Sequence, residues 1–111
     1  MTAVQPLSSQ VFQILLSLVD QDLHGYAIIQ DVAERTGNDV RLTASTLYAA
    51  GKRLLDQGLI DEVRSRSRDD DPRRRYYRLT PAGRKAARDE ALRLERLAAM
   101  ARAKRLLPST R

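Results

Sequence analysis

The chain has 111 residues, with no cysteine, one histidine and a formal net charge of +6. This length fits a single small domain, and the lack of cysteine excludes disulfides, iron–sulfur clusters, thiolate nucleophiles and the usual zinc sites. The amino-terminal residues do not resemble a signal peptide and the longest apolar run is too short to cross a bilayer. We therefore expect a cytoplasmic protein that does not enter a membrane.

The positive charge lies in the second half of the chain. Residues 1–63 hold 4 basic and 8 acidic side chains, residues 64–78 hold 7 and 3, and residues 79–111 hold 9 and 3. Such an asymmetry is typical of a protein that binds nucleic acid or another acidic partner, although a solvated basic tail gives the same count.

The first predicted helix begins at Ser8 or Ser9, after a loose arm at residues 1–7. Its apolar face consists of Val11, Ile14, Leu15, Leu18 and Val19. Phe12 and Leu16 widen this face beyond what one contact needs. We expect them to pack either on a partner subunit or on more of the protein's own core.

A second helix is predicted from His24-Gly25-Tyr26 to Gly37. Gly25 would let a neighbouring backbone approach closely, and Tyr26 can bury its ring while its hydroxyl finds a polar partner. His24 has no second histidine, cysteine or nucleophile to act with, so we expect a structural hydrogen bond near the helix start rather than catalysis or ligand binding.

A third helix is predicted from a capping hydroxyl at Thr43 to Gly58, which can adopt the left-handed conformation of a helix end. Its core face consists of Leu47, Ala50, Gly51, Leu54 and Leu55. Its opposite face consists of Ser45, Ala49, Lys52 and Arg53. Small, hydroxylic and basic residues suit contact with DNA, although most helices with two basic residues outside are simply solvated.

A β-hairpin follows, with strands predicted at residues 59–66 and 74–79. The tip contains three aspartates, Asp69 to Asp71, without the spaced ligand pattern of a metal loop, so we expect a solvated turn. Arginines around the tip can reach a phosphate backbone or a minor groove. Tyr76 and Tyr77 alternate across the second strand, so one of them should be in the core.

The final helix is predicted from Thr80-Pro81 to about Leu107, with a tail at residues 108–111. Its seam of mostly small residues consists of Ala87, Ala91, Leu94, Ala98 and Ala101, with Leu97 beside it. We expect this seam to pack against a second copy of the same helix. The alternative is a helix that folds back over its own domain.

The residues offer no site for catalysis. A nucleophile with a base, a pair of coupled titratable groups or a glycine-rich phosphate loop cannot be assembled from them. We therefore expect neither an enzyme nor a bound cofactor.

These elements predict a mainly α-helical protein with a small β-hairpin: a winged helix-turn-helix domain over residues 1–79 and a dimerisation helix over residues 80–107. The pattern becomes more specific in five segments, which occur in order along the chain: His24–Tyr26, Thr46–Tyr48, Arg53-Leu54, Gly58–Ile60 and Arg75–Gly83. They resemble signatures of the PadR-like family of bacterial transcriptional regulators, in its short subclass with a single terminal helix.

The resemblance implies that the third helix is a recognition helix and that the hairpin is a wing. The residues it places at DNA are Thr43, Ser45, Thr46, Tyr48, Lys52, Arg53, Arg73 and Arg74. The final helix would pair with the first helix of a partner subunit. The residues expected at this interface are Phe12, Leu16, Ala87, Ala91, Leu94, Leu97, Ala98 and Ala101.

The function implied is a homodimeric, sequence-specific repressor that binds a pseudo-palindromic DNA operator and is released by a small apolar or aromatic effector. The effector pocket would be lined by Phe12, Leu16, Leu94 and Leu97, although a filled dimer core is an alternative. A different class of function is a protein-interaction module that has the same fold but no specific DNA binding.

Two departures from the family pattern lie in the third helix. Ala44-Ser45 stands where the family commonly has proline and glycine, and Gly51 stands at a core position that is usually leucine. A glycine there costs roughly 1 kcal/mol relative to alanine. We expect a neighbour such as Phe12 or Tyr26 to cover it.

Overall fold

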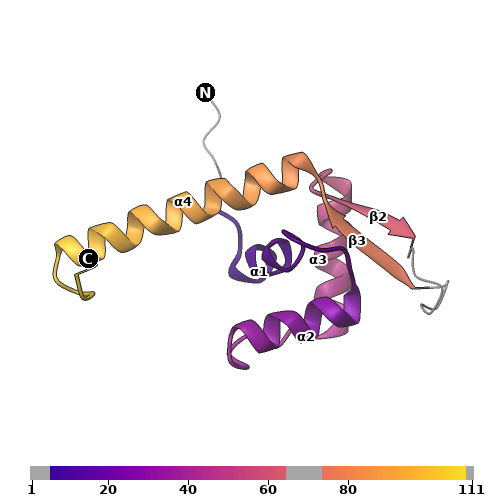
Figure 1. Ribbon diagram of the computed structural model, residues 1–111, viewed down its shortest axis with the longest axis horizontal. Coiled ribbons are helices and arrows are strands. Elements are labelled where there is room, and N and C mark those ends of the chain that lie inside the picture. The colour runs from indigo at the N-terminus through magenta and orange to yellow at the C-terminus, as the bar shows by residue number, and fades with distance from the viewer. Residues whose placement is uncertain (1–5, 65–73, 110–111) are drawn as a thin grey trace.

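The computed structural model describes residues 6–64 and 74–109. Within these ranges the elements are α1 (Ser9–Ser17), β1 (Leu23–His24), α2 (Gly25–Arg35), α3 (Ala44–Asp56), β2 (Ile60–Arg64), β3 (Arg75–Leu79) and α4 (Pro81–Ala103). Helices α1, α2 and α3 lie on one side of α4, and α4 continues beyond them as an arm while β2 and β3 extend at the opposite end (Figure 1). None of the helices in the described ranges has both the length and the apolarity needed to cross a membrane.

Each helix begins at a side chain that caps it. Ser8, Thr43 and Thr80 accept the backbone N–H three residues later through a hydroxyl, at 3.1, 3.1 and 3.0 Å. His24 does the same through Nδ1, which accepts the N–H of Ala27 at 3.1 Å. These contacts confirm the predicted helix starts and the structural hydrogen bond expected of His24.

The helix ends depend on residues in the left-handed conformation. Gly58, with φ of +73°, follows α3 as predicted, and the N–H of Leu59 closes the end on the Leu54 carbonyl at 3.0 Å. Helix α4 ends at Ala103 rather than at the predicted Leu107. The prediction was wrong because Arg105 adopts φ of +63°, which turns the chain before Pro108 is reached.

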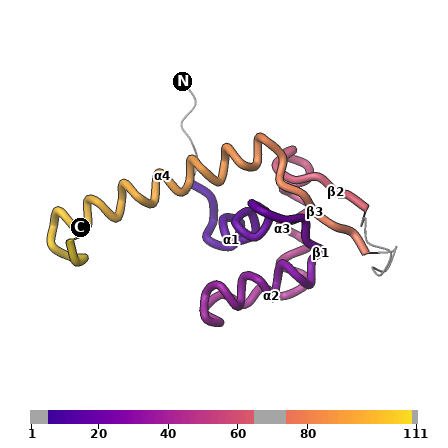
Figure 2. Tube along the Cα trace, viewed as in Figure 1, coloured from indigo at the N-terminus to yellow at the C-terminus, as the bar shows by residue number. Residues whose placement is uncertain are grey.

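The strands form an antiparallel sheet in the order β1-β3-β2. The sequence predicted β2 and β3 but not β1, which pairs Leu23 with Tyr77 and His24 with Tyr76. Two residues are too few to show the alternation that identifies a strand. Figure 2 shows β1 beside β3, so the residue that caps α2 is also part of the sheet. The hairpin tip, including Asp69 to Asp71, lies outside the described residues.

The core joins the four helices to the sheet. Its buried members are Ile14, Leu15, Leu18, Ile28, Val32, Leu42, Leu47, Ala50, Leu54, Ile60, Tyr77 and Ala87. Tyr77 is therefore the core tyrosine of the predicted alternating pair. Two other predictions were wrong: Val19 lies beyond the end of α1 and is exposed, and Tyr26 is 64% exposed rather than buried.

The first turn of α4 is fixed to the segment that follows α3. Thr80 donates through Oγ1 to the Gly58 carbonyl at 2.7 Å and through its N–H to the Leu59 carbonyl at 3.1 Å. Gly83 lies so close to the same segment that a Cβ there would overlap the Leu59 carbonyl oxygen. A side chain at position 83 would therefore separate α4 from the end of α3.

Helix α4 belongs to the body of the protein up to Glu90. Arg84 donates to the Val19 carbonyl at 2.7 Å, and the buried Glu90 carboxylate accepts the N–H of Leu7 at 3.2 Å. Arg93 lies 2.6 Å from the same carboxylate, and its hydrogen bond lowers the pKa of Glu90 below the ordinary value. Beyond this point α4 projects away from the other helices (Figure 1).

Candidate nucleic-acid interface

The two faces of α3 are divided as the sequence predicts. Leu47, Ala50, Gly51 and Leu54 are buried. On the opposite side Ser45, Ala49, Lys52 and Arg53 are exposed. The basic and hydroxylic face is therefore open to a partner.

Three hydroxyl groups gather at the start of α3. Thr43 donates through Oγ1 to Thr46 Oγ1 at 2.9 Å, and the same oxygen lies 3.3 Å from Ser45 Oγ. Helix α3 begins regularly at Ala44, so the departure at Ala44-Ser45 does not disturb the helix start. Hydroxyls at a helix start suit contact with phosphate oxygens, because the first turn also carries unpaired N–H groups and the positive end of the helix dipole.

The β3 strand adds arginines close to α2 and α3. Arg74 is exposed immediately before β3, and its Nη1 lies 3.3 Å from Nε2 of His24. Arg75 lies 3.6 Å from the Glu62 carboxylate, so its charge is partly balanced. Arg73, the other wing arginine that the sequence predicts at DNA, lies outside the described residues.

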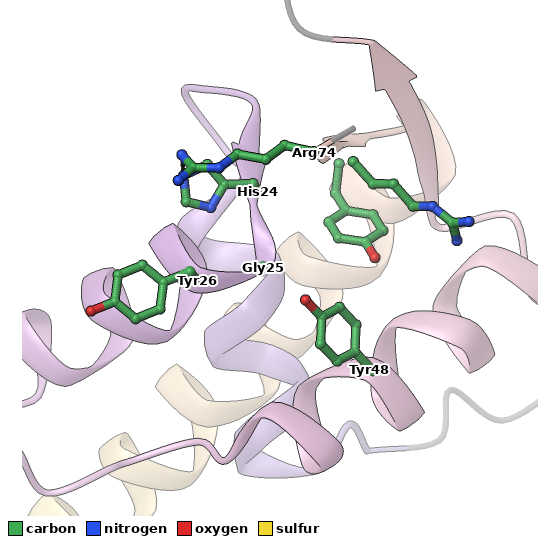
Figure 3. A pocket seen from close by; sticks show the side chains of 7 residues that line it. His24, Gly25, Tyr26, Tyr48 and Arg74 are labelled. Atoms are coloured by element: carbon green, nitrogen blue, oxygen red, sulfur yellow. Dashed lines mark hydrogen bonds between the residues drawn. The ribbon is translucent and has the colours of Figure 1, made fainter. Parts of the chain in front are cut away.

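A cavity of about 450 Å³ opens between the start of α2, the start of α3 and β3. Its lining consists of His24, Gly25, Tyr26, Tyr48, Arg74, Arg75 and Tyr77. In Figure 3 Tyr48 rises from α3 towards Gly25, and Arg74 reaches across from β3 to His24. The sequence predicted Tyr48 and Arg74 at DNA but gave no site role to His24, Gly25 and Tyr26, which also line the cavity and form one of the family signatures.

Gly25 allows α2 and α3 to meet at this cavity. A Cβ on Gly25 would lie 2.9 Å from Leu47 Cδ2 and 3.3 Å from Tyr48 Oη. The predicted close approach exists, but it is made by side chains rather than by backbone. Tyr48 remains 57% exposed while its hydroxyl lies over the start of α2.

The buried Tyr77 hydroxyl stays protonated. Burial raises the pKa of Tyr77, and the negative charge of Glu62 raises it further, against an opposing effect of Arg75. A phenol with a raised pKa remains a neutral donor at neutral pH.

Gly51 faces unfilled space. No side-chain atom approaches within 4 Å of the position that its Cβ would occupy. The expectation that Phe12 or Tyr26 covers Gly51 was therefore wrong.

The residues expected at a dimer interface differ in exposure. Phe12 and Leu16 are half-buried, Ala91 is exposed, and Ala98 and Ala101 are half-buried. Leu94 and Leu97 are 40% and 47% exposed. Ala87 is instead 6% exposed, because it packs in the protomer's own core. The part of the seam that a partner can reach therefore begins at Ala91, and it is flanked by two further exposed apolar residues, Leu92 and Met100.

Comparison with known proteins identifies the family to which this fold belongs. The family model "Transcriptional regulator PadR-like family" matches residues 14–89, from α1 into α4. The chain belongs to this family. Its fold is the winged helix-turn-helix of PadR-like regulators, with β2 and β3 as the wing.

Two solved structures of transcriptional regulators illustrate the similarity. A transcriptional regulator from Clostridium thermocellum is 29% identical, with a TM-score of 0.71 over 87% of this chain and 96% of that chain. Bacillus subtilis PadR, solved in complex with operator DNA, is 26% identical, with a TM-score of 0.64 over 76% of this chain and 47% of that chain. In sequence, an uncharacterised protein of Lysinibacillus sphaericus is 35% identical over 70 residues, and the match spans 63% of this chain and 63% of that protein's length.

Proposed function

We propose that this PadR-like regulator is a homodimeric repressor that recognises a specific DNA operator with α3. The observation that carries the proposal is the exposed face of α3, where hydroxyl and basic side chains stand opposite a buried apolar face. The operator complex of the related Bacillus subtilis PadR supports the assignment.

The proposed contacts divide by chemistry. The hydroxyls of Thr43, Ser45 and Thr46 suit phosphate oxygens, because they gather at the amino-terminal turn of α3. Lys52 and Arg53 follow on the exposed side, where they can reach base edges or phosphates. Tyr48 lies between these groups and the wing, and Arg73 and Arg74 would contact an adjoining groove.

The proposed dimer uses the projecting part of α4. Leu94 and Leu97 expose apolar surface that pairing with a second α4 would bury, and the small side chains of Ala91, Ala98 and Ala101 would let two helices cross closely. The first helix of the partner would add Phe12 and Leu16. Two recognition helices would then read half-sites about one helical turn apart, roughly 34 Å.

Selection of bound duplexes from a random pool tests the proposal. We expect enrichment of a pseudo-palindrome, with the selected duplex bound at least about 1,000-fold more tightly than random duplexes at physiological salt. Equal binding of all duplexes would instead favour a winged-helix module that docks an acidic protein. Sedimentation tests the dimer: Leu97→Asp should yield monomers, whereas Arg88→Ala, an exposed change nearer the body, should not.

We also propose that a small apolar or aromatic effector binds between subunits at Phe12, Leu16, Leu94 and Leu97. In one protomer Phe12 and Leu16 are half-buried and Leu94 and Leu97 are exposed, so these side chains are available to line a shared space. A thermal-shift screen should find a compound that stabilises the wild type and releases DNA. A stabilising compound that acts equally on Leu97→Asp would place the site elsewhere.

A further inference from the structure

We propose that Thr36 is a positioning residue for DNA recognition. Its hydroxyl sets the direction in which the chain enters α3, and thereby the placement of the side chains on the exposed face of that helix. The inference rests on the proposed function, because it takes α3 as the helix that reads DNA. Thr36 is half-buried directly after α2, and the role requires no contact between Thr36 and DNA.

The Thr36 hydroxyl joins the end of α2 to the segment that leads into α3. Its Oγ1 donates to the Val32 carbonyl at 2.8 Å and accepts the Val40 N–H at 3.0 Å. A hydroxyl has one proton and two acceptor lone pairs, so both hydrogen bonds can form at once. Thr36 therefore bridges the turn formed by residues 37–39.

The backbone of this turn is sharply bent. Gly37 and Asn38 both have left-handed backbone conformations, with φ of +59° and +69°. The N–H of Asn38 donates to the Ala33 carbonyl at 2.8 Å, and that of Asp39 to the Thr36 carbonyl at 3.1 Å. Because residues 37–39 are exposed, hydrogen bonds rather than buried side chains hold the turn.

The two groups that the Thr36 hydroxyl joins both belong to the packed part of the protein. Val32 is buried in the core, and Val40 packs against the core from the other side of the turn. Leu42, two residues further on, is also buried, and Thr43 then caps α3. The position of Val40 therefore determines where α3 begins.

Arg35 holds the end of α2 against α1. Its guanidinium donates to the Gln13 carbonyl at 3.0 Å, to Gln13 Oε1 at 2.7 Å and to the hydroxyl of the buried Ser17 at 2.7 Å. The Asp31 carboxylate accepts from Nε of Arg35 at 2.8 Å. The residue before Thr36 is thus fixed to a second helix, so Thr36 holds Val40 from a defined position.

Loss of the hydroxyl should affect specific DNA binding more than non-specific binding. Base contacts require side chains held within about 0.5 Å of the productive geometry, whereas non-specific attraction depends on the number of phosphates neutralised. Thr36→Val keeps the branched shape but leaves the partly buried Val40 N–H without its acceptor. The variant therefore changes the support of α3 without changing any charge.

Anisotropy titrations with the selected duplex and with random duplexes test the inference. We expect Thr36→Val to bind the selected duplex about tenfold more weakly, which corresponds to the loss of one hydrogen bond. Its affinity for random duplexes and its salt slope should equal those of the wild type. Thr36→Ser, which restores the hydroxyl, should recover specific binding. A lower salt slope for Thr36→Val would mean a direct phosphate contact and would overturn the positioning role.

Ser8→Ala is the matched control for stability. It also removes a hydroxyl that accepts a backbone N–H, but at the start of α1. Urea midpoints should fall for both Ser8→Ala and Thr36→Val, whereas only Thr36→Val should lose specific affinity at a temperature where both are folded. An equal loss of specific affinity in Ser8→Ala would show that lower stability explains the effect, against a positioning role.

Hydrogen exchange tests the positioning without DNA. In Thr36→Val the amide protons of Val40 and Leu47 should exchange at least about tenfold faster. Leu47 reports on the first turn of α3, because its N–H donates to the Thr43 carbonyl at 2.9 Å. Exchange at Phe12, in α1, should not change.

The two experiments separate this inference from the proposed function. Failure to select any duplex would refute the proposed function, and hydrogen exchange would then decide the inference: faster exchange at Leu47 supports positioning of α3 by Thr36, and unchanged exchange refutes it. If a duplex is selected, wild-type affinity of Thr36→Val for that duplex refutes the inference and leaves the proposed function standing.

Discussion

Replacing Gly51 by alanine should stabilise the protein. Gly51 lies inside α3 on its buried face, and no side-chain atom comes within 4 Å of the position of the new Cβ. Alanine is favoured over glycine in a helix interior by about 1 kcal/mol, and burial of one methyl group adds up to about 0.8 kcal/mol. We therefore expect an increase of about 1 to 2 kcal/mol in the free energy of unfolding.

Urea denaturation at one fixed protein concentration measures this increase, since a dimer's stability depends on concentration. Thermal unfolding should shift upwards by at least about 4 °C. Two controls bracket the result. Ala49→Gly, on the exposed face of α3, should cost about 1 kcal/mol through helix propensity alone. Gly25→Ala should destabilise the protein by about 1 to 3 kcal/mol, because its Cβ would lie 2.9 Å from Leu47 Cδ2.

A Gly51→Ala variant that is no more stable than the wild type would refute this reasoning, provided that Ala49→Gly is destabilised as expected. Such a result would mean that the space beside Gly51 closes in solution. DNA affinity should not change, because position 51 lies on the opposite side of α3 from the proposed contacts.

Three further predictions follow from named contacts. Gly83→Ala should destabilise the protein by about 1 to 3 kcal/mol in urea, since its Cβ would overlap the Leu59 carbonyl. Lys52→Ala should lower the salt slope of DNA binding by about 0.9, whereas an unchanged slope would remove Lys52 from the interface. The pKa of Glu90 is held below its ordinary value by Arg93, so this stabilisation is present above about pH 4.5 and is lost as pH falls through the lowered pKa. Urea midpoints of Glu90→Gln should therefore fall less than those of the wild type between about pH 6 and about pH 3.

The helix boundaries were largely predictable because they depend on local chemistry. Thr43 and Thr80 cap helices through hydrogen bonds to a residue three positions away. Because the interaction is local, the capping residue can be recognised from the sequence alone. Gly58 ends α3 for a similarly local reason. Arg105 shows the limit: a non-glycine residue in the left-handed conformation gives no signal in its side chain, so the end of α4 was placed too late.

The candidate site was less predictable because it is built by tertiary packing. The face of α3 follows from helical periodicity, and Lys52 and Arg53 are exposed as expected. The cavity depends instead on β1, a strand of two residues that pairs with β3 only in the folded chain. Its pairing brings His24 and Arg74 together across 50 positions of sequence, a distance that no local pattern spans.

The junction between Gly58, Leu59 and Thr80 has a mechanical consequence. Its hydrogen bonds and the close approach at Gly83 hold the carboxyl end of α3 in direct contact with the amino end of α4. These contacts therefore fix the direction of α4 relative to α3. Because α4 extends about 35 Å at 1.5 Å per residue, the direction set at this contact determines how far its carboxyl end lies from the outer face of α3.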